Sequence, residues 1–106
     1  MTTETKPEAL DVYWRPGCMF CSSLKRSLKR RGVPMRLHNI WDDPEAATVV
    51  RAAARGNETV PTVVIGGEAL VNPTPQAVEA LIARIAPELL PPRTDRAGRR
   101  KFWRRR

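Results

Sequence analysis

One stretch of this chain constrains its fold more than any other, because it joins a strand pattern to a helix pattern across a tight turn. Residues 10–14 form a short, mostly apolar run typical of a β-strand, and a Pro-Gly turn follows at 16–17. From Cys18 onward the apolar residues recur at helical spacing, and Gly32 supplies a stop. The only cysteines of the chain, Cys18 and Cys21, both lie in the first turn of this predicted helix.

The position of Cys18 at the predicted helix start favours reactive sulfur chemistry. The first backbone N–H groups of a helix lack intrahelical partners, and the helix dipole adds partial positive charge there. This environment favours the thiolate of Cys18, which is the nucleophilic form. Arg15, three residues upstream, can add to the effect or hold an anionic thiol substrate. Cys21, almost one turn further on, can attack a mixed disulfide formed on Cys18.

Three other uses of the cysteine pair stay open at this point. A closed zinc site normally needs four ligands, and His38 is the only histidine that could join the two thiols. The remaining options are a pair of inert thiols and an iron–sulfur cluster shared between two chains through Cys18. The strand-to-helix context favours a catalytic redox pair, with no metal ligands and no tightly bound cofactor.

Positive charge is distributed unevenly along the chain. The formal net charge of the 106 residues is +8, but residues 93–106 hold eight basic residues and one acidic residue. Residues 1–92 therefore carry only about +1. We expect a flexible N-terminus over 1–9, one domain over 10–90 and a basic, disordered tail over 91–106. Aromatic residues inside this basic tail suit an acidic partner, an anionic lipid surface or nucleic acid.

Two further features of the sequence indicate where the protein is expected to act. No apolar run approaches the ~20 residues of a membrane span. Residues 1–8 lack the basic and apolar regions of a secretory signal. Two closely spaced cysteines without such a signal are typical of a reducing compartment, so we expect a cytoplasmic protein. We also expect the protein to be monomeric.

The remaining patterns complete a predicted α/β fold. Further strands are predicted over 35–41, 59–65 and 68–71, the last two joined by a Gly-Gly hairpin turn. Two further helices are predicted, one from Pro44 to Gly56 or Asn57 with Asp43 as its N-cap, and one from Pro75 to about Pro87 with Thr74 as its N-cap. The first of these is expected to bury Ala46, Val49, Val50, Ala53 and Ala54. The order β-α-β-α-β-β-α predicts one mixed four-stranded sheet flanked by helices, with a parallel first strand pair and an antiparallel closing hairpin.

This order, together with Cys-Met-Phe-Cys at 18–21 and Thr-Val-Pro at 59–61, resembles the glutaredoxin family of the thioredoxin fold over roughly residues 10–90. The resemblance implies that Cys18 is the nucleophile and Cys21 the resolving cysteine. It also implies that Pro61 is a cis-proline beside the active-site sulfur, and that the Val60 backbone pairs with a bound thiol. The substrate-binding residues that it implies are Arg15, Phe20, Thr59, Val60, Pro61 and Asn72.

Residues 55–63 and 70–74 look most like the mycoredoxins, actinobacterial glutaredoxin-like proteins that use mycothiol instead of glutathione. Asn72-Pro73 departs from the acidic pair typical of glutathione users, whereas Met19-Phe20 departs from the Gly-Tyr usual in mycoredoxins. The resemblance implies a thiol–disulfide oxidoreductase that reduces mixed disulfides between proteins and a low-molecular-weight thiol. Mycothiol is favoured over glutathione as the co-substrate.

Two other functions remain open. One is a dithiol redoxin that a thioredoxin reductase or a similar disulfide reductase reduces, and that donates electrons to an enzyme of the ribonucleotide reductase type. The other is a non-enzymatic iron–sulfur or interaction module.

Overall fold

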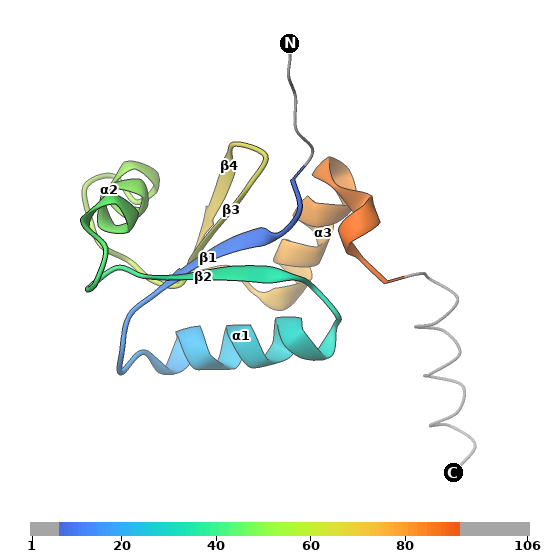
Figure 1. Cartoon of the computed structure of the whole chain (residues 1–106), viewed down its shortest axis with the longest axis horizontal. Coiled ribbons are helices and arrows are strands. Elements are labelled where there is room, and N and C mark those ends of the chain that lie inside the picture. Colours follow the sequence, from blue (N-terminus) through green and yellow to red (C-terminus); the bar gives the residue numbers. More distant parts are fainter. Residues whose placement is uncertain (1–6, 92–106) are drawn as a thin grey trace.

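The computed structural model describes residues 7–91, so residues 1–6 and nearly all of the predicted basic tail lie outside the described part of the chain. Residues 7–91 form a thioredoxin-like fold with helices on both faces of a mixed sheet (Figure 1). The elements are β1 (Leu10–Trp14), α1 (Met19–Arg30), β2 (Met35–Asn39), α2 (Pro44–Ala53), β3 (Thr62–Ile65), β4 (Glu68–Val71), α3 (Pro75–Ile85) and the short 3₁₀ helix η1 (Pro87–Leu89). The predicted fold class and element order are confirmed.

The sheet brings several strand ends to a single edge. Its strand order is β2-β1-β3-β4, with β1 parallel to β2 and antiparallel to β3, and with β3 and β4 as an antiparallel hairpin. Trp14 pairs with Asn39, Tyr13 pairs with Thr62, and Thr62 also pairs with Val71. The ends of β1, β2 and β4 and the start of β3 therefore meet at one edge.

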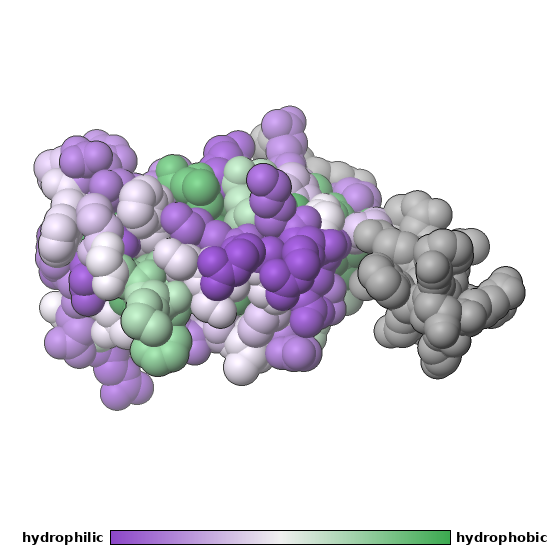
Figure 2. All heavy atoms as spheres, turned by 90° about the horizontal axis from the view of Figure 1, so that it is seen from below, coloured by the Kyte–Doolittle hydropathy of each residue, from purple (hydrophilic) through white to green (hydrophobic). Residues whose placement is uncertain are grey.

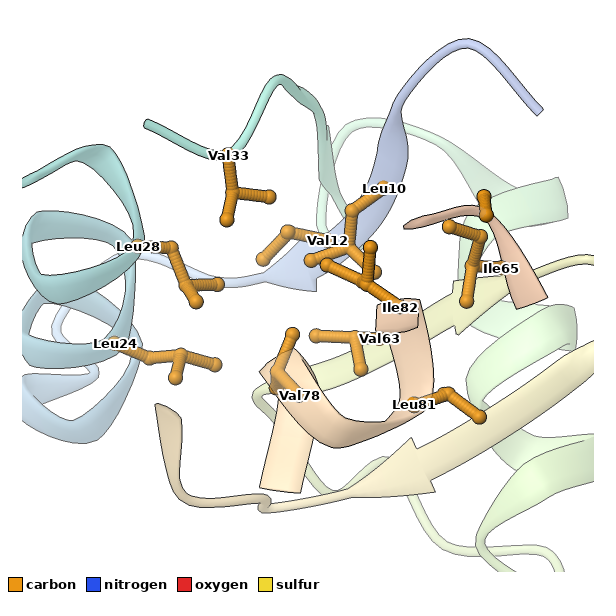
Figure 3. Packing of buried hydrophobic residues seen from close by; sticks show 11 residues of the cluster. Leu10, Val12, Leu24, Leu28, Val33, Val63, Ile65, Val78, Leu81 and Ile82 are labelled. Atoms are coloured by element: carbon orange, nitrogen blue, oxygen red, sulfur yellow. The ribbon is translucent and has the colours of Figure 1, made fainter. Parts of the chain in front are cut away.

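Apolar side chains form a separate cluster on each face of the sheet. The larger cluster lies between the sheet and helices α1 and α3 (Figure 3), and consists of Leu10, Val12, Leu24, Leu28, Val33, Val63, Ile65, Val78, Leu81, Ile82 and Ala86. The smaller cluster lies against α2 and consists of Tyr13, Ile40, Ala46, Ala47 and Val50. Because successive strand residues point to opposite faces, Val12 and Tyr13 of β1 belong to different clusters.

The predicted helix caps are confirmed. The Asp43 carboxylate accepts a hydrogen bond from the Glu45 N–H at 3.1 Å, and the Thr74 hydroxyl accepts one from the Ala77 N–H at 3.1 Å. Each of these bonds satisfies a backbone donor that the first helical turn cannot pair.

Three predicted element boundaries are wrong. β3 begins at Thr62 instead of 59, because Pro61 has no N–H to donate to a neighbouring strand. β2 ends at Asn39 instead of 41, and the Asn39 side-chain oxygen accepts a hydrogen bond from the Trp41 N–H that turns the chain. α2 ends at Ala53 instead of Gly56, because Arg55 and Gly56 adopt left-handed backbone conformations with φ of 58° and 91°.

The burial predicted for Val49, Ala53 and Ala54 is also wrong. Val49 is 36% exposed, and the two alanines at the end of the helix are only half-buried. α2 buries Ala46, Ala47 and Val50. Ala46 and Val50 lie one turn apart on the helix, and Ala47 flanks them on one side. The buried stripe is therefore rotated toward Ala47, which leaves Val49 at its opposite margin.

The β3–β4 turn contains two glycines with similar backbones and different surroundings. A Cβ on Gly66 (φ +56°) would lie 2.6 Å from Cγ2 of Ile85, whereas a Cβ on Gly67 (φ +82°) would meet no atom within 4 Å. We expect Gly66→Ala to lower the free energy of unfolding by about 1–3 kcal/mol more than Gly67→Ala, because only the first must displace Ile85. Chemical denaturation of both variants measures this difference. Equal losses would mean that Ile85 gives way without cost.

No helix within residues 7–91 is long and apolar enough to cross a membrane.

Candidate active site

The two cysteines lie where β1 leaves the sheet and α1 begins. Cys18 is the N-cap of α1, and its Sγ accepts a hydrogen bond from the Cys21 N–H at 3.1 Å. The two sulfurs form a disulfide in this structure. The Cys18 sulfur therefore sits against a backbone donor that the helix itself leaves unpaired.

The two sulfurs differ in their access to solvent. Cys21 is only 1% exposed, and it lies on the buried side of α1 with Leu24 and Leu28. Cys18 is partly exposed. Cys18 is therefore the sulfur that an incoming disulfide can approach from solvent, whereas Cys21 is covered.

Residues from the loop before β3 lie directly beside Cys18. The Cys18 Sγ lies 3.8 Å from the carbonyl oxygen of Val60, and the Val60–Pro61 peptide bond is cis. The carbonyl of Pro61 accepts a hydrogen bond from the Asn72 N–H at 2.7 Å. The structure thus brings the Val60–Pro61 loop beside Cys18 and Asn72 against Pro61, although these three segments lie far apart in the sequence.

Thr59 contributes to this loop through its backbone. Its carbonyl oxygen accepts a hydrogen bond from the hydroxyl of Thr62 at 2.8 Å, and Thr62 is fully buried at the start of β3. Asn72 has a φ of 51°, which asparagine tolerates better than most residues. The hydrogen bond between Thr59 and Thr62 therefore helps to fix the backbone of the loop around Pro61.

Arg15 has different contacts from those that its sequence position suggests. Its guanidinium carbon lies 5.9 Å from the centroid of the Trp41 ring, and its Nη1 donates a hydrogen bond to the carbonyl of Pro16 at 3.3 Å. Within residues 7–91, no hydrogen bond joins Arg15 to Cys18. Arg15 thus lies on the β2 side of the site as part of a cation–π pair.

Three large apolar side chains just after the ends of β1 and β2 are largely exposed. Met19 is 81% exposed, Phe20 is 71% exposed and Trp41 is 64% exposed. Trp41 was not among the residues predicted for the site. Its signal in the sequence was an aromatic residue at the end of the strand predicted over 35–41, which was expected to run parallel to the strand that leads to Cys18.

An open pocket lies on the α1 side of Cys18. It has a volume of about 530 Å³ and is lined by Gly17, Cys18, Met19, Ser22, Ser23 and Arg26. The sequence did not single out Ser22, Ser23 or Arg26 for the site. Cys18 is thus flanked by the Val60–Pro61 loop and by this pocket.

A polar cluster lies on the α2 face of the sheet. Asp11 accepts a hydrogen bond from Arg36 Nε at 3.1 Å and pairs with His38 Nε2 at 2.9 Å, and the His38 ring stacks on Tyr13. Burial raises the pKa of Tyr13, and the charges of Asp11 and Asp43 raise it further against an opposing effect of Arg36. The Tyr13 phenol is therefore neutral near pH 7. Among residues 7–91, no three His, Cys, Asp or Glu side chains form a group that could hold a metal ion.

A comparison with known families establishes the relationship. The family model described as Glutaredoxin matches residues 10–70, which extend from β1 into β4 and include both cysteines. The chain belongs to the glutaredoxin family. Membership indicates thiol–disulfide oxidoreductase chemistry, and glutaredoxins use glutathione-type thiols as co-substrates. Among curated proteins, none matches this chain in sequence.

Solved structures share the fold of this glutaredoxin. The thioredoxin-like protein BC3987 is 26% identical with a TM-score of 0.60, over 68% of this chain and 97% of that chain. NrdH-redoxin from Escherichia coli is 29% identical with a TM-score of 0.59, over 69% of this chain and 93% of that chain. The glutaredoxin grx-1 from Archaeoglobus fulgidus is 25% identical with a TM-score of 0.56, over 69% and 84%. The expected family and fold are confirmed, and the likeness to mycoredoxins stays a prediction.

Proposed function

We propose that this glutaredoxin reduces mixed disulfides between proteins and a low-molecular-weight thiol, with Cys18 as nucleophile and Cys21 as resolving cysteine. The observation that carries the proposal is the unequal setting of the two sulfurs. Cys18 is partly exposed and accepts the Cys21 N–H, whereas Cys21 is 1% exposed. After reduction of the pair, that N–H and the helix dipole stabilise a thiolate on Cys18.

The reaction begins when the Cys18 thiolate attacks the sulfur of the small thiol in the mixed disulfide. A new disulfide forms between Cys18 and the small thiol, and the protein leaves as its thiolate and takes up a proton. A second molecule of the small thiol then attacks this intermediate, which returns Cys18 as thiolate and releases the oxidised dimer of the small thiol. Alternatively, Cys21 attacks Cys18, which releases the small thiol and leaves the disulfide that this structure contains.

The neighbours of Cys18 supply the parts of a thiol-binding site. The Val60 backbone beside the sulfur can pair with the peptide-like part of a bound thiol. Asn72, held next to Pro61, offers its side-chain amide to a polar end of the ligand. Arg15 supplies a permanent positive charge, Phe20 supplies an exposed aromatic ring, and Thr59 supplies the backbone that leads to Val60.

The choice of thiol is tested by presenting one protein substrate as its mycothiol and as its glutathione mixed disulfide, each with the matching free thiol as reductant. We expect a higher kcat/KM with mycothiol, because Asn72-Pro73 replaces the acidic pair typical of glutathione users. We also expect Cys21→Ser to keep part of this activity, since a second small thiol can replace Cys21. Equal rates with both thiols would contradict the mycothiol preference. Complete loss in Cys21→Ser would contradict the monothiol route.

The similarity to NrdH-redoxin favours a second candidate function. That protein is described as glutaredoxin-like with a thioredoxin-like activity profile. The corresponding function here is a dithiol redoxin that is reduced by a thioredoxin reductase. Reduction of the Cys18–Cys21 disulfide by such a reductase, without response to either small thiol, would favour this candidate over the first.

A further inference from the structure

Helix α1 carries several positive charges and no negative one. Its 12 residues include Lys25, Arg26, Lys29 and Arg30 and no carboxylate. Arg31, the C-cap, adds a fifth cation. The rest of residues 1–92 hold six basic and ten acidic residues. The nearly neutral domain is thus polarised, with its positive charge concentrated on α1.

Three of these cations have no partner within the described part of the chain. Lys25 Nζ lies 4.0 Å from the centroid of the Trp14 ring, and Arg31 forms a salt bridge of 3.0 Å with Glu79. The other three, which we call the α1 basic face, are all exposed and form no ion pair with any of residues 7–91; they are Arg26, Lys29 and Arg30. Their spacing of three and four residues places them on one side of the helix.

The α1 basic face leads toward the reactive sulfur. Cys18, Ser22, Arg26 and Arg30 follow one another at intervals of four residues, so they form a continuous stripe along α1. The open pocket at the Cys18 end of this stripe has both Cys18 and Arg26 in its wall. Figure 2, which views the molecule from the side of α1, shows a strongly hydrophilic area next to a smaller apolar patch.

We propose that the α1 basic face binds an acidic segment of the protein substrate, on the same polypeptide as the disulfide that Cys18 attacks. This inference rests on the proposed function, since it describes the partner of that redox site. A chain that reaches from Cys18 to Arg26 or Arg30 must span about 12–18 Å along the helix axis. An extended peptide covers this distance in about four to six residues. The substrate therefore carries Asp or Glu about four to six positions from its cysteine.

The neighbouring redox site favours a polypeptide over a nucleic acid or an anionic lipid as the ligand of the α1 basic face. A nucleic acid or an anionic lipid also attracts cations, but neither contains the disulfide that the sulfur at the end of this stripe consumes. The contribution expected from three exposed pairs is modest and falls with salt, because each charge is well solvated. Such pairs suit recognition of a transient substrate more than formation of a permanent complex.

The test uses the full chain and two peptides whose single cysteine forms a mixed disulfide with the preferred small thiol. One peptide has glutamates four to six positions from the cysteine, and the other has glutamines there. We expect the unmodified protein to prefer the acidic peptide by about tenfold in kcat/KM at low ionic strength. The triple variant Arg26→Gln, Lys29→Gln, Arg30→Gln should bring this ratio close to one. High salt should do the same to the unmodified protein.

A matched control removes the same number of charges away from α1. The variant Arg51→Gln, Arg55→Gln, Arg84→Gln should keep the preference, because these residues lie on or after α2 and on α3. An equal loss of preference in both triple variants, or no preference in the unmodified protein, would overturn the proposal.

Binding is measured separately, so that docking is tested independently of the reaction. Versions of both peptides with serine in place of cysteine are titrated by fluorescence anisotropy, beside a single-stranded oligonucleotide. Weaker binding of the acidic peptide by the α1 variant alone supports docking, whether or not the protein reduces mixed disulfides. Absence of reduction together with normal acidic-peptide binding would count against the proposed function only. Binding of the oligonucleotide with no preference between the peptides would assign the face to nucleic acid and overturn the proposal.

Discussion

Cys18→Ser is expected to lower the rate of mixed-disulfide reduction by about a thousandfold or more, to the background rate of the free thiols. The serine keeps the position of the N-cap, but its hydroxyl is not ionised near neutral pH and cannot form a disulfide. The rate is measured with a mixed disulfide of a small thiol under saturating reductant. Cys21→Ser is the matched control, because it removes the other sulfur of the same site.

The two variants distinguish the roles of the sulfurs as well as their importance. Cys21 is buried, so its loss should leave the first attack intact and affect only the release step. Mass spectrometry should then find the small thiol trapped on Cys18 of the Cys21→Ser variant. Trapping on Cys21 in the Cys18→Ser variant, with activity retained, would reverse the assignment.

Leu28→Ala is expected to destabilise the domain by about 3 kcal/mol. Leu28 is fully buried and joins α1 to the larger apolar cluster (Figure 3), so its truncation leaves a cavity between helix and sheet. In a domain of this size the loss should lower Tm by more than about 10 °C. Thermal unfolding followed by circular dichroism measures this shift.

Leu37→Ala is the control for Leu28→Ala. Leu37 has the same side chain but is 50% exposed on the edge strand β2. Its truncation should change the stability by less than about 1 kcal/mol. Similar losses from both variants would mean that α1 contributes less packing energy than its buried positions indicate.

The local structure of this glutaredoxin could be predicted from its sequence, because each helix cap or turn depends on residues only a few positions apart. Asp43 and Thr74 mark helix starts since their side chains accept nearby N–H groups. The Gly-Gly pair marks the β3–β4 turn since both glycines adopt positive φ. The position of Cys18 at the start of α1 followed from the same kind of local pattern.

The cis-proline and the family came from a different source. No local property of Val60 or Pro61 predicts a cis bond, and that expectation came from the resemblance to glutaredoxins. The structure contains this bond beside the Cys18 sulfur. The roles implied for Arg15, Phe20 and Asn72 stay predictions, which the comparison of mycothiol with glutathione addresses in part.

The sequence by itself therefore determined the order of the elements, most of their boundaries and the place of the cysteine pair at the start of α1, because these depend on neighbouring residues. Only the tertiary structure decided what surrounds the reactive sulfur, because strand register brings distant loops to one edge of the sheet. That register placed Val60 beside Cys18, held Asn72 against Pro61 and paired Arg15 with Trp41. Packing also decided the orientation of α1, and thereby turned Arg26, Lys29 and Arg30, which form no ion pair with any of residues 7–91, to the solvent on the helix that begins at Cys18.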